Sequence, residues 1–250
     1  MSRKPKTAIV TGASGGLGKA IAEAFVGNGY NVVVSGTNAE RLTETMAEIG
    51  VPDRAVAIVA DITRPEDRKK IVHAAIDHFG RVDVLVNNAG VFEPRPFLDV
   101  DEAHLDRFLD INLKGTFFLT QEVVPHFHRV GGGSVVNVGT VLVDHAIGGV
   151  PATAPISSKG AIHALTGQLA AEFGSKNIRF NTIAPGIIRS PMHERNGIED
   201  ADSLGGLHLL SRIGEPSEIA NAALLLAESD FITGTVINVD GGHVAGHAIN

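Results

Sequence analysis

The sequence contains no cysteine, which excludes disulfide bonds, thiolate metal ligands and a thiol nucleophile. It also has no excess of positive charge: 21 Lys and Arg residues face 28 Asp and Glu residues, so the formal charge is −7 at pH 7. Because nucleic acids and anionic membrane surfaces attract a basic face, neither is an expected partner.

Long apolar segments are missing as well. No apolar run approaches the roughly 20 residues that a membrane-spanning helix needs. The basic N-terminus leads directly into the strand-like TAIV, without the apolar core and cleavage site of a signal peptide. Together with the absence of thiols, which suits a reducing compartment, these features predict a soluble, cytoplasmic protein.

The chain has 250 residues, 44% of them hydrophobic, which is enough to fill one large core. Short runs rich in β-branched residues recur along it, and most are continuously apolar, as expected for strands covered on both faces. The predicted strands are Thr7–Thr11, Asn31–Ser35, Ala55–Ala60, Val82–Val86, Ser134–Val138, Arg179–Ile183 and Val236–Val239.

Helical patterns separate these strands. The predicted helices are Gly16–Asn28, Ala39–Ile49, Pro65–Phe79, Asp101–Arg129, Ser157–Phe173 and Pro216–Glu228. This alternation predicts a single α/β domain over residues 1–250, a doubly wound Rossmann-type fold with a parallel sheet of about seven strands and helices on both faces. We interpret the irregular stretch 187–213 as a mobile substrate lid, with a plain surface loop as the alternative.

A glycine-rich turn joins the first predicted strand to the first helix and reads Thr11-Gly12-Ala13-Ser14-Gly15-Gly16-Leu17-Gly18. Glycines allow the backbone to turn tightly and to approach a pyrophosphate closely. The helix that follows presents unpaired N–H groups and the positive end of its dipole to such an anion. Because the turn follows a strand and opens a helix, it predicts a dinucleotide-binding site.

This turn and further motifs resemble those of the short-chain dehydrogenase/reductase family, in the family's order and over nearly the whole chain. The turn matches the TGxxxGxG signature. The other matches are Asp61 after the third strand, the NNAG motif at Asn87–Gly90, Asn112 in INLKG, Pro185-Gly186 followed by Ser190, and the last strand with its turn at Ile232–Gly242. The resemblance implies an NAD or NADP cofactor, a small alcohol or carbonyl substrate, and a homotetramer assembled through the helices Asp101–Arg129 and Ser157–Phe173.

The resemblance also implies which residues bind the cofactor. They are Gly12, Ser14, Gly15, Gly16, Leu17, Gly18, Thr37, Asn38, Asp61, Ile62, Asn88, Ala89, Gly90, Lys159, Pro185, Gly186, Ile188 and Ser190. Gly36 stands where an acidic residue would bond the ribose of NAD and repel the extra phosphate of NADP. We therefore expect NADP to be preferred over NAD, with Thr37 and Asn38 as the groups that could bond the phosphate. Arg41 is a further candidate, with a solvated helix residue as the favoured alternative.

The family's catalytic residues are only partly present. By resemblance, Lys159 supports the proton donor and holds the ribose, Asn112 holds a water, and Thr140 replaces the serine that polarises the carbonyl. The family's tyrosine stands four residues before the lysine, a spacing that places both side chains on one helix face. That position is Pro155, and the only tyrosine of the chain, Tyr30, precedes the second predicted strand.

Proline cannot exchange a proton, although as the first residue of a helix it would cost the fold no hydrogen bond. Loss of a positioned acid or base typically slows a reaction about 10²–10⁴-fold. As replacement we rank Lys159 acting through a water held by Asn112 first, and His145, in the loop after Thr140, second. The candidates that we rank lower are Ser157 and Ser158, expected to point away from the face of Lys159, and His163, expected to pack deeper.

Three functions remain open. The first is an NAD(P)-dependent oxidoreductase with an altered proton-transfer group. The second is a non-catalytic dinucleotide-binding sensor or partner subunit, and the third is a non-redox enzyme on the same fold. We expect no metal site, because the pair His243 and His247 stands in a glycine-rich tail that is a poor helix.

Overall fold

Seven parallel strands form one sheet in the centre of the computed structural model, which describes residues 4–246. The strand order is β3-β2-β1-β4-β5-β6-β7, and every neighbouring pair is parallel. The strands are β1 (Thr7–Thr11), β2 (Asn31–Gly36), β3 (Ala55–Val59), β4 (Val84–Asn87), β5 (Gly133–Val138), β6 (Ile178–Pro185) and β7 (Val236–Val239). This sheet and its flanking helices confirm the predicted doubly wound class.

The strand order reverses at β1, which pairs with β2 on one side and with β4 on the other. From β1 the chain first builds outward through β2 and β3, and then crosses over to β4. The loops that leave β1 and β4 therefore diverge at the carboxyl ends of these strands. In open α/β sheets this switch point is where ligands bind.

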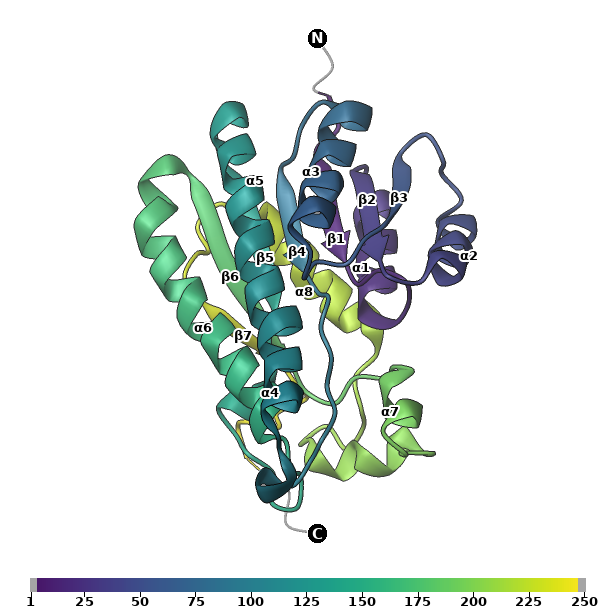
Figure 1. Cartoon of the computed structure of the whole chain (residues 1–250), viewed down its shortest axis with the longest axis vertical. Helices are drawn as coiled ribbons and strands as arrows, with labels where there is room; N and C mark the ends of the chain where they lie inside the picture. The colour runs from purple at the N-terminus through teal and green to yellow at the C-terminus, as the bar shows by residue number, and fades with distance from the viewer. Residues whose placement is uncertain (1–3, 247–250) are drawn as a thin grey trace.

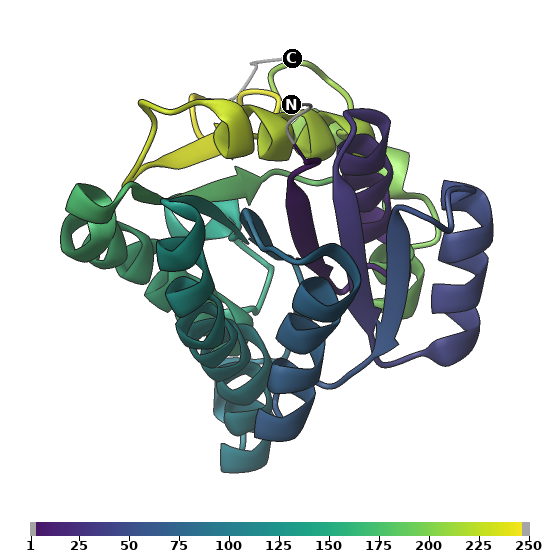
Figure 2. The ribbon, with the colours of Figure 1, turned by 90° about the horizontal axis from the view of Figure 1, so that it is seen from above.

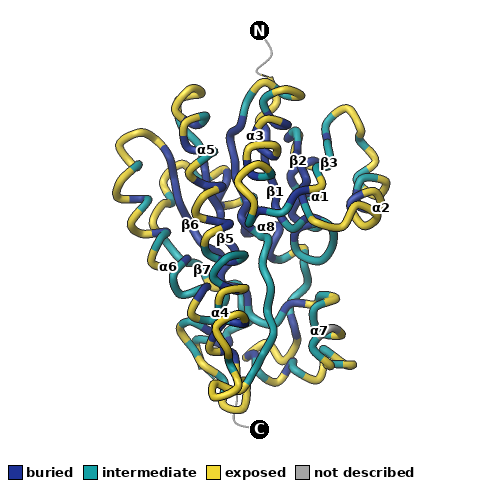
Figure 3. Tube along the Cα trace, viewed as in Figure 1, coloured by how far each residue is buried: buried dark blue, intermediate teal, exposed yellow. Residues whose placement is uncertain are grey.

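Helices cover both faces of the sheet, so the molecule has three layers, which are visible from above in Figure 2. One face is covered by α1 (Gly16–Gly27) and α8 (Pro216–Glu228), and α2 (Ala39–Ile49) packs at the edge of the same core; the other face is covered by α3 (Pro65–Phe79), α5 (Thr116–Val130) and α6 (Thr153–Phe173). The inner strands are almost entirely buried and the edge strands β3 and β7 only partly, and the exposed residues gather on the outer helix faces and in the loops (Figure 3).

The segment predicted as one helix, Asp101–Arg129, has three parts. It consists of α4 (Glu102–Phe108), a π-helical segment η2 (Leu109–Gly115) and α5. A π-helical segment was not predicted, because such segments are rare and occur mostly as short insertions inside α-helices. Its last residue, Gly115, lies so close to Ile62 that an added Cβ atom would approach the Ile62 side chain to 2.7 Å.

Helix α6 begins at Thr153, four residues before the predicted start. Pro155 is therefore the third residue of the helix and not the first, which corrects our expectation. The energetic conclusion is unchanged, because the first backbone bond inside α6 is donated by Ile156 to the carbonyl of Ala152. The missing N–H of Pro155 precedes that bond and removes none.

Segment 187–213 lies beyond the carboxyl ends of the strands, in the lower part of Figure 1, and contains α7 (Met192–Arg195) and a 3₁₀ segment η5 (Ala201–Leu207). Arg189 links the start of the segment to its middle and to the residue before α8: its guanidinium donates to Asp202 at 2.6 Å and to Glu215 at 3.0 Å. Within residues 4–246 no helix is long and apolar enough to cross a membrane.

Candidate active site

The glycine turn after β1 has a backbone path that side chains would block. Gly12 and Gly16 adopt φ values of +63° and +54°, which favour glycine. A Cβ atom at Gly12 would lie 2.8 Å from the backbone of Ala89, and one at Gly18 would lie 2.3 Å from the carbonyl oxygen of Gly12. The turn is thus pressed against the loop after β4 on one side and against helix α1 on the other.

Asn88 holds this turn in place. Its side-chain amide donates to the carbonyl oxygens of Thr11 at 2.9 Å and Gly12 at 3.1 Å. The Thr11 hydroxyl in turn accepts the backbone N–H groups of Asn88 and Ala89. Both N–H bonds of the Asn88 amide are therefore used on the turn, so the Asn88 side chain acts as a positioning group for it.

The geometry fits a bound dinucleotide phosphate. Helix α1 begins at Gly16, and its N-cap residue Gly15 provides no side-chain cap, so the first N–H groups of the helix are open to an anion. Around Gly15 an added Cβ atom would meet nothing within 4 Å, which leaves space for a ligand over the turn. Across the crevice, the backbone N–H of Ile188 has no partner among residues 4–246.

Two side chains from distant segments meet beside Gly90, at the end of the NNAG motif. An added Cβ atom at Gly90 would lie 3.1 Å from Oδ1 of Asn112 and 3.2 Å from Nζ of Lys159. Asn112 comes from the π-helical segment, is 1% exposed, and exchanges hydrogen bonds with the backbone of Val91 at 2.9 and 3.1 Å. Its amide also donates to the Ser158 hydroxyl at 2.9 Å, which links η2 to α6.

Lys159 provides the titratable group of this cluster. Its ammonium donates to the carbonyl oxygen of Val138, at the end of β5, at 2.6 Å. Burial lowers the pKa of Lys159 to about 8, because the surrounding protein disfavours the charged form. An ammonium group with this pKa releases and regains protons far more readily near neutral pH than an exposed lysine does.

The other predicted catalytic residues have different surroundings. Thr140 follows β5, and its hydroxyl accepts the backbone N–H of Leu142 at 3.3 Å. His145 lies edge-to-face against His243, with ring centroids 5.1 Å apart. Pro155 is buried in the first turn of α6, on the same helix as Lys159.

Sequence reasoning missed the role of Ser158. We expected Ser158 only to point away from the face of Lys159; it is fully buried, accepts from Asn112 and donates to the carbonyl of Pro155 at 2.6 Å. What the sequence did not indicate is this partner, because the hydrogen bond joins η2 to α6 across 46 residues of the chain. His163, as expected, packs inward: an added Cβ atom at Gly139 would lie 2.4 Å from its Nε2 atom.

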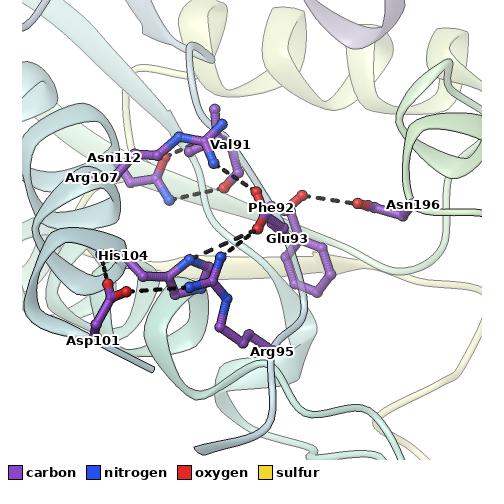
Figure 4. A network of polar contacts seen from close by, with 9 residues as sticks. All are labelled: Val91, Phe92, Glu93, Arg95, Asp101, His104, Arg107, Asn112 and Asn196. Carbon is purple, nitrogen blue, oxygen red and sulfur yellow. Dashed lines mark hydrogen bonds and ion pairs between the residues drawn. The ribbon is translucent and has the colours of Figure 1, made fainter. Parts of the chain in front are cut away.

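A polar network fixes the loop that follows Gly90, as Figure 4 shows. Glu93 accepts from Arg107 at 2.7 Å and from Arg95 at 3.2 Å, and these hydrogen bonds, Arg107 first, lower the pKa of its carboxyl. Asn196, just after α7, donates to the carbonyl oxygen of Phe92 at 3.4 Å. The loop is therefore held by η2, by α4 and by segment 187–213 together. The sequence offered no signal for this network, because its charged residues look like ordinary surface groups.

The corner after β2 carries the groups predicted to distinguish NAD from NADP. Thr37, Asn38 and Arg41 are exposed there, and the Asn38 side chain caps α2 by accepting the backbone N–H of Arg41 at 2.9 Å. An added Cβ atom at Gly36 would lie 3.1 Å from the Ser14 hydroxyl, so this corner adjoins the glycine turn. The Asp61 carboxylate is turned locally onto Thr63, whose backbone N–H and hydroxyl it accepts.

Histidine 243 is fully buried, and its Nδ1 atom lies 3.0 Å from the carbonyl oxygen of Leu207. The second histidine of the pair considered for a metal, His247, lies outside the described residues. Among residues 4–246 no group of three or more His, Asp or Glu side chains is placed to hold a metal ion.

Known proteins with this architecture are numerous, and their similarity runs along the full chain. Residues 12–244 match a family model described as enoyl-(acyl carrier protein) reductase. An uncharacterised oxidoreductase of Methylorubrum extorquens is 37% identical over 247 residues, covering 95% of this chain and 97% of its own. The 3-oxoacyl-(acyl-carrier-protein) reductase of Thermotoga maritima is 36% identical over 248 residues, covering 98% of this chain and 100% of its own.

A crystal structure of a protein assigned as a gluconate dehydrogenase, from Agrobacterium tumefaciens, superposes with a TM-score of 0.89 at 30% identity and covers 96% of each chain. The fold, the glycine turn and these relatives agree. The chain belongs to the short-chain dehydrogenase/reductase family of oxidoreductases, in the branch matched by the enoyl-(acyl carrier protein) reductase model.

Proposed function

We propose that this protein transfers a hydride between NAD(P) and a small alcohol or carbonyl substrate, and that Lys159, through a water beside Asn112, exchanges the substrate proton. The observation that carries the proposal is the cluster at Gly90, where Lys159 with a pKa of about 8 lies next to the buried amide of Asn112. A bound nicotinamide would supply or accept the hydride. The rest of the chemistry belongs to the protein's own residues.

Those residues divide the work as follows. The Thr140 hydroxyl, at the end of β5, bonds the substrate oxygen and polarises the carbonyl. In the direction of reduction the substrate oxygen takes a proton from the water, and the water regains it from the Lys159 ammonium; oxidation reverses this path. Pro155, four residues before Lys159, takes no part in proton transfer. Because it stands where the family has its tyrosine, the proposed mechanism differs from that of the family.

The first experiment follows nicotinamide absorbance with purified protein, NADPH or NADH, and a panel of ketones, aldehydes, alcohols and sugar acids. The relatives named above motivate the inclusion of an acyl thioester and of gluconate. We expect turnover that is slow for the family, by about 10²–10⁴-fold, because the positioned phenol is missing. Lys159→Met removes the proton group and should abolish turnover, whereas Pro155→Tyr should raise it.

The mutants also test the second candidate, a dinucleotide-binding sensor or partner subunit, which the buried Pro155 favours. If the wild type binds NADPH tightly but turns over no substrate, while Pro155→Tyr gains activity, the sensor replaces the enzyme as the proposed function. If His145→Gln abolishes turnover and Lys159→Met does not, the proton passes through His145, our second-ranked group. Melting curves of all variants exclude loss of folding as the cause.

We infer that NADP is the preferred cofactor. At the end of β2 Gly36 occupies the usual acidic position, and Thr37, Asn38 and the Arg41 guanidinium are exposed around it, with the Glu40 carboxylate as the acidic group in the first turn of α2. The N-terminus of α2 begins at the same corner, and its dipole favours a phosphate. Arg41→Ala should therefore raise the KM for NADPH more than the KM for NADH.

The expected homo-oligomer has a candidate surface in the structure. An apolar groove runs between η2 with α5 on one side and α6 on the other, lined by Leu113, Lys114, Phe117, Phe118, Ala161, Ala164, Leu165 and Gln168. Phe117 and Phe118 are 42% and 40% exposed, which is unusual for phenylalanine. We propose that a second copy of this chain covers the groove, so that Phe117→Glu converts the oligomer to a smaller species in light scattering.

A further inference from the structure

The turn after β6 depends on one side chain from a distant segment. Most of its backbone groups pair with other backbone: the Gly186 N–H donates to Val239, the Ile187 carbonyl accepts from Gly214, and the Arg189 N–H donates to Gly214. The Ile187 N–H is different, because it donates to Nε2 of His208 at 3.1 Å. His208 follows η5 in segment 187–213.

His208 is enclosed on both sides. It is 3% exposed. A Cβ atom at Gly186 would lie 2.9 Å from its Nε2 atom, and one at Gly241 would lie 3.2 Å from its Cβ atom. The ring is therefore wedged between the turn after β6 and the turn after β7. A cavity of about 50 Å³ adjoins it, bounded by Ile187, Ile188 and Asp240, so the turn has room to move if the hydrogen bond is lost.

The hydrogen bond requires a neutral ring. Because Nε2 accepts the Ile187 N–H, the single ring proton must be on Nδ1. A second proton would place an N–H group on Nε2, facing the Ile187 N–H, and the bond would be replaced by repulsion. Protonation of His208 thus breaks the contact without any other change in the chain.

Charged and titratable groups surround His208 on several elements. Burial and the His243 ring, whose centroid lies 5.7 Å away, lower its pKa, and Arg212 acts in the same direction. The Gly205 backbone and Asp240 act in the opposite direction and raise the pKa of His208. His145 packs on His243 from the loop after β5 and so extends the stack towards the substrate side. The net effect is a lowered pKa, so the ring is neutral at pH 7.

We propose that His208 is a positioning residue: its neutral ring holds the backbone of Gly186, Ile187 and Ile188 in the conformation that receives the cofactor, and its protonation releases that backbone. The proposal rests on the proposed function, because it assumes that the Ile188 N–H, which has no partner among residues 4–246, is presented to the nicotinamide end of the cofactor. The proposal adds to that function a link between the cofactor and segment 187–213, because His208, which sets the conformation of the turn after β6, belongs to this segment.

The test compares two substitutions of similar size. The amide of His208→Gln can place an acceptor oxygen near the Nε2 position, whereas His208→Met fills the space without an acceptor. His73→Gln, an exposed histidine on α3, is the matched control. The dissociation constant of NADPH is measured by nicotinamide fluorescence between pH 5.5 and 8, and hydrogen exchange of the peptide covering residues 185–190 is followed without cofactor.

At pH 7.5 we expect His208→Met to bind NADPH about tenfold more weakly than the wild type, the effect of losing one buried hydrogen bond. His208→Gln should bind NADPH within about threefold of the wild type, and it should lose the decline in affinity that the wild type shows in acid, where His208 becomes protonated. Exchange of the Ile187 amide should rise in His208→Met only. The His73→Gln control should follow the wild type in every measurement.

Unchanged affinity and exchange in His208→Met, or identical pH profiles for the wild type and His208→Gln, would overturn the proposal. Failure of the proposed function has a different signature: the wild type turns over no substrate, or it binds neither NADPH nor NADH. In that case the exchange experiment still decides, since faster exchange at Ile187 in His208→Met but not in His208→Gln retains His208 as the residue that sets the turn, and unchanged exchange removes it.

Discussion

Lys159 is enclosed by backbone rather than by carboxylates. Its ammonium has the carbonyl of Val138 as hydrogen-bond acceptor, and burial lowers its pKa to about 8. At pH 7 about nine-tenths of the molecules still carry the charge, so the group can donate a proton in reduction. Above pH 8 most molecules have lost it. Reduction therefore uses the charged form of Lys159, which prevails below this pKa, and oxidation uses the neutral form, which prevails above it.

The first prediction follows from that sign. With saturating substrate, the rate of ketone reduction should fall as the pH rises through about 8, and the rate of alcohol oxidation should rise over the same range. Steady-state rates between pH 6 and 10 measure both. Lys159→Arg keeps a positive charge that does not titrate in this range. The change in rate around pH 8 should therefore be absent from the pH profile of this variant. A wild-type profile that is flat around pH 8 in both directions would remove Lys159 as the proton group.

The second prediction concerns Gly36, at the corner after β2. In Gly36→Asp the new carboxylate would repel the 2′-phosphate of NADPH and bond the ribose of NADH, so the preference should move toward NADH by at least about tenfold. Gly36→Ala adds the same Cβ atom, 3.1 Å from the Ser14 hydroxyl, but no charge. It should affect both cofactors alike, and the ratio of kcat/KM values separates the two effects. Equal shifts in both variants would show that this corner does not read the cofactor.

Helix α1 offers a test at the level of one element, because two of its glycines differ in their surroundings. Gly18→Ala places a Cβ atom 2.3 Å from the Gly12 carbonyl and 2.5 Å from the Asn88 amide, so the turn must shift. We expect loss of NADPH binding and a decrease of about 1–3 kcal/mol in the free energy of unfolding. Gly27→Ala, at the last residue of the same helix, meets nothing within 4 Å and should keep binding while gaining stability. Urea unfolding and fluorescence titration check both.

Helix α8 ends on a buried arginine from a neighbouring strand. The Arg179 guanidinium donates to the carbonyl oxygens of Leu226 at 2.6 Å and Ala227 at 2.7 Å, at the C-terminal end of the helix. Arg179→Met should lower the free energy of unfolding by about 1–3 kcal/mol, because these carbonyls lose their donors. Arg179→Lys keeps the charge but not the planar guanidinium. Its free energy of unfolding should therefore lie between those of the wild type and Arg179→Met. Equal urea midpoints for all three proteins would contradict this role.

Most elements of this fold could be predicted from the sequence. The bounds of β1, β7, α2, α3 and α8 agree with the predicted ones, because β-branched runs, first-turn prolines and helix-ending glycines are local signals. The divided helix around Asn112 and the early start of α6 could not be predicted. The divided helix carries hydrogen bonds of Asn112 with Val91 and Ser158, which are distant in the chain and which no local pattern contains. The first turn of α6 begins with a bond from Ile156 to Ala152, in a stretch that has no side-chain N-cap to mark the start.

The candidate site, too, could be predicted only in part from the sequence. The motif residues came from the family resemblance, and the structure brings Gly90, Asn112 and Lys159 together. Whether they bind the cofactor and exchange protons stays a prediction. The supporting groups, Ser158 and the network around Glu93, were missed, because a serine and a surface glutamate carry no signal of their partners.

On the scale of the whole molecule, several histidines are partly buried in neutral form. Burial lowers the pKa of His126, His163, His193 and His208 below the usual value of 6.5. The unfolded chain therefore binds protons more readily than the folded one, so stability should decrease as the pH falls below about 6.5. Glu218, whose pKa is lowered to about 2 by Arg212, adds stability above its usual pKa and loses it only in stronger acid.

The corresponding prediction is that urea midpoints decline steadily from pH 7 to pH 5, before the carboxylates contribute. His208→Gln should flatten this slope, and the exposed His73→Gln should leave it unchanged. A midpoint that stays constant from pH 7 to pH 5 would show that these histidines protonate in the folded protein without cost.

The position of Pro155 has a consequence for how such a chain can change over time. Deeper in α6 a proline would remove a backbone bond and weaken the helix, so selection for folding would discard it. In the first turn, before the Ile156 bond to Ala152, it removes none. Selection for a folded molecule and selection for a particular acid therefore act independently at this residue. A lineage could pass from one proton chemistry to another through a single replacement, with a folded protein at every step.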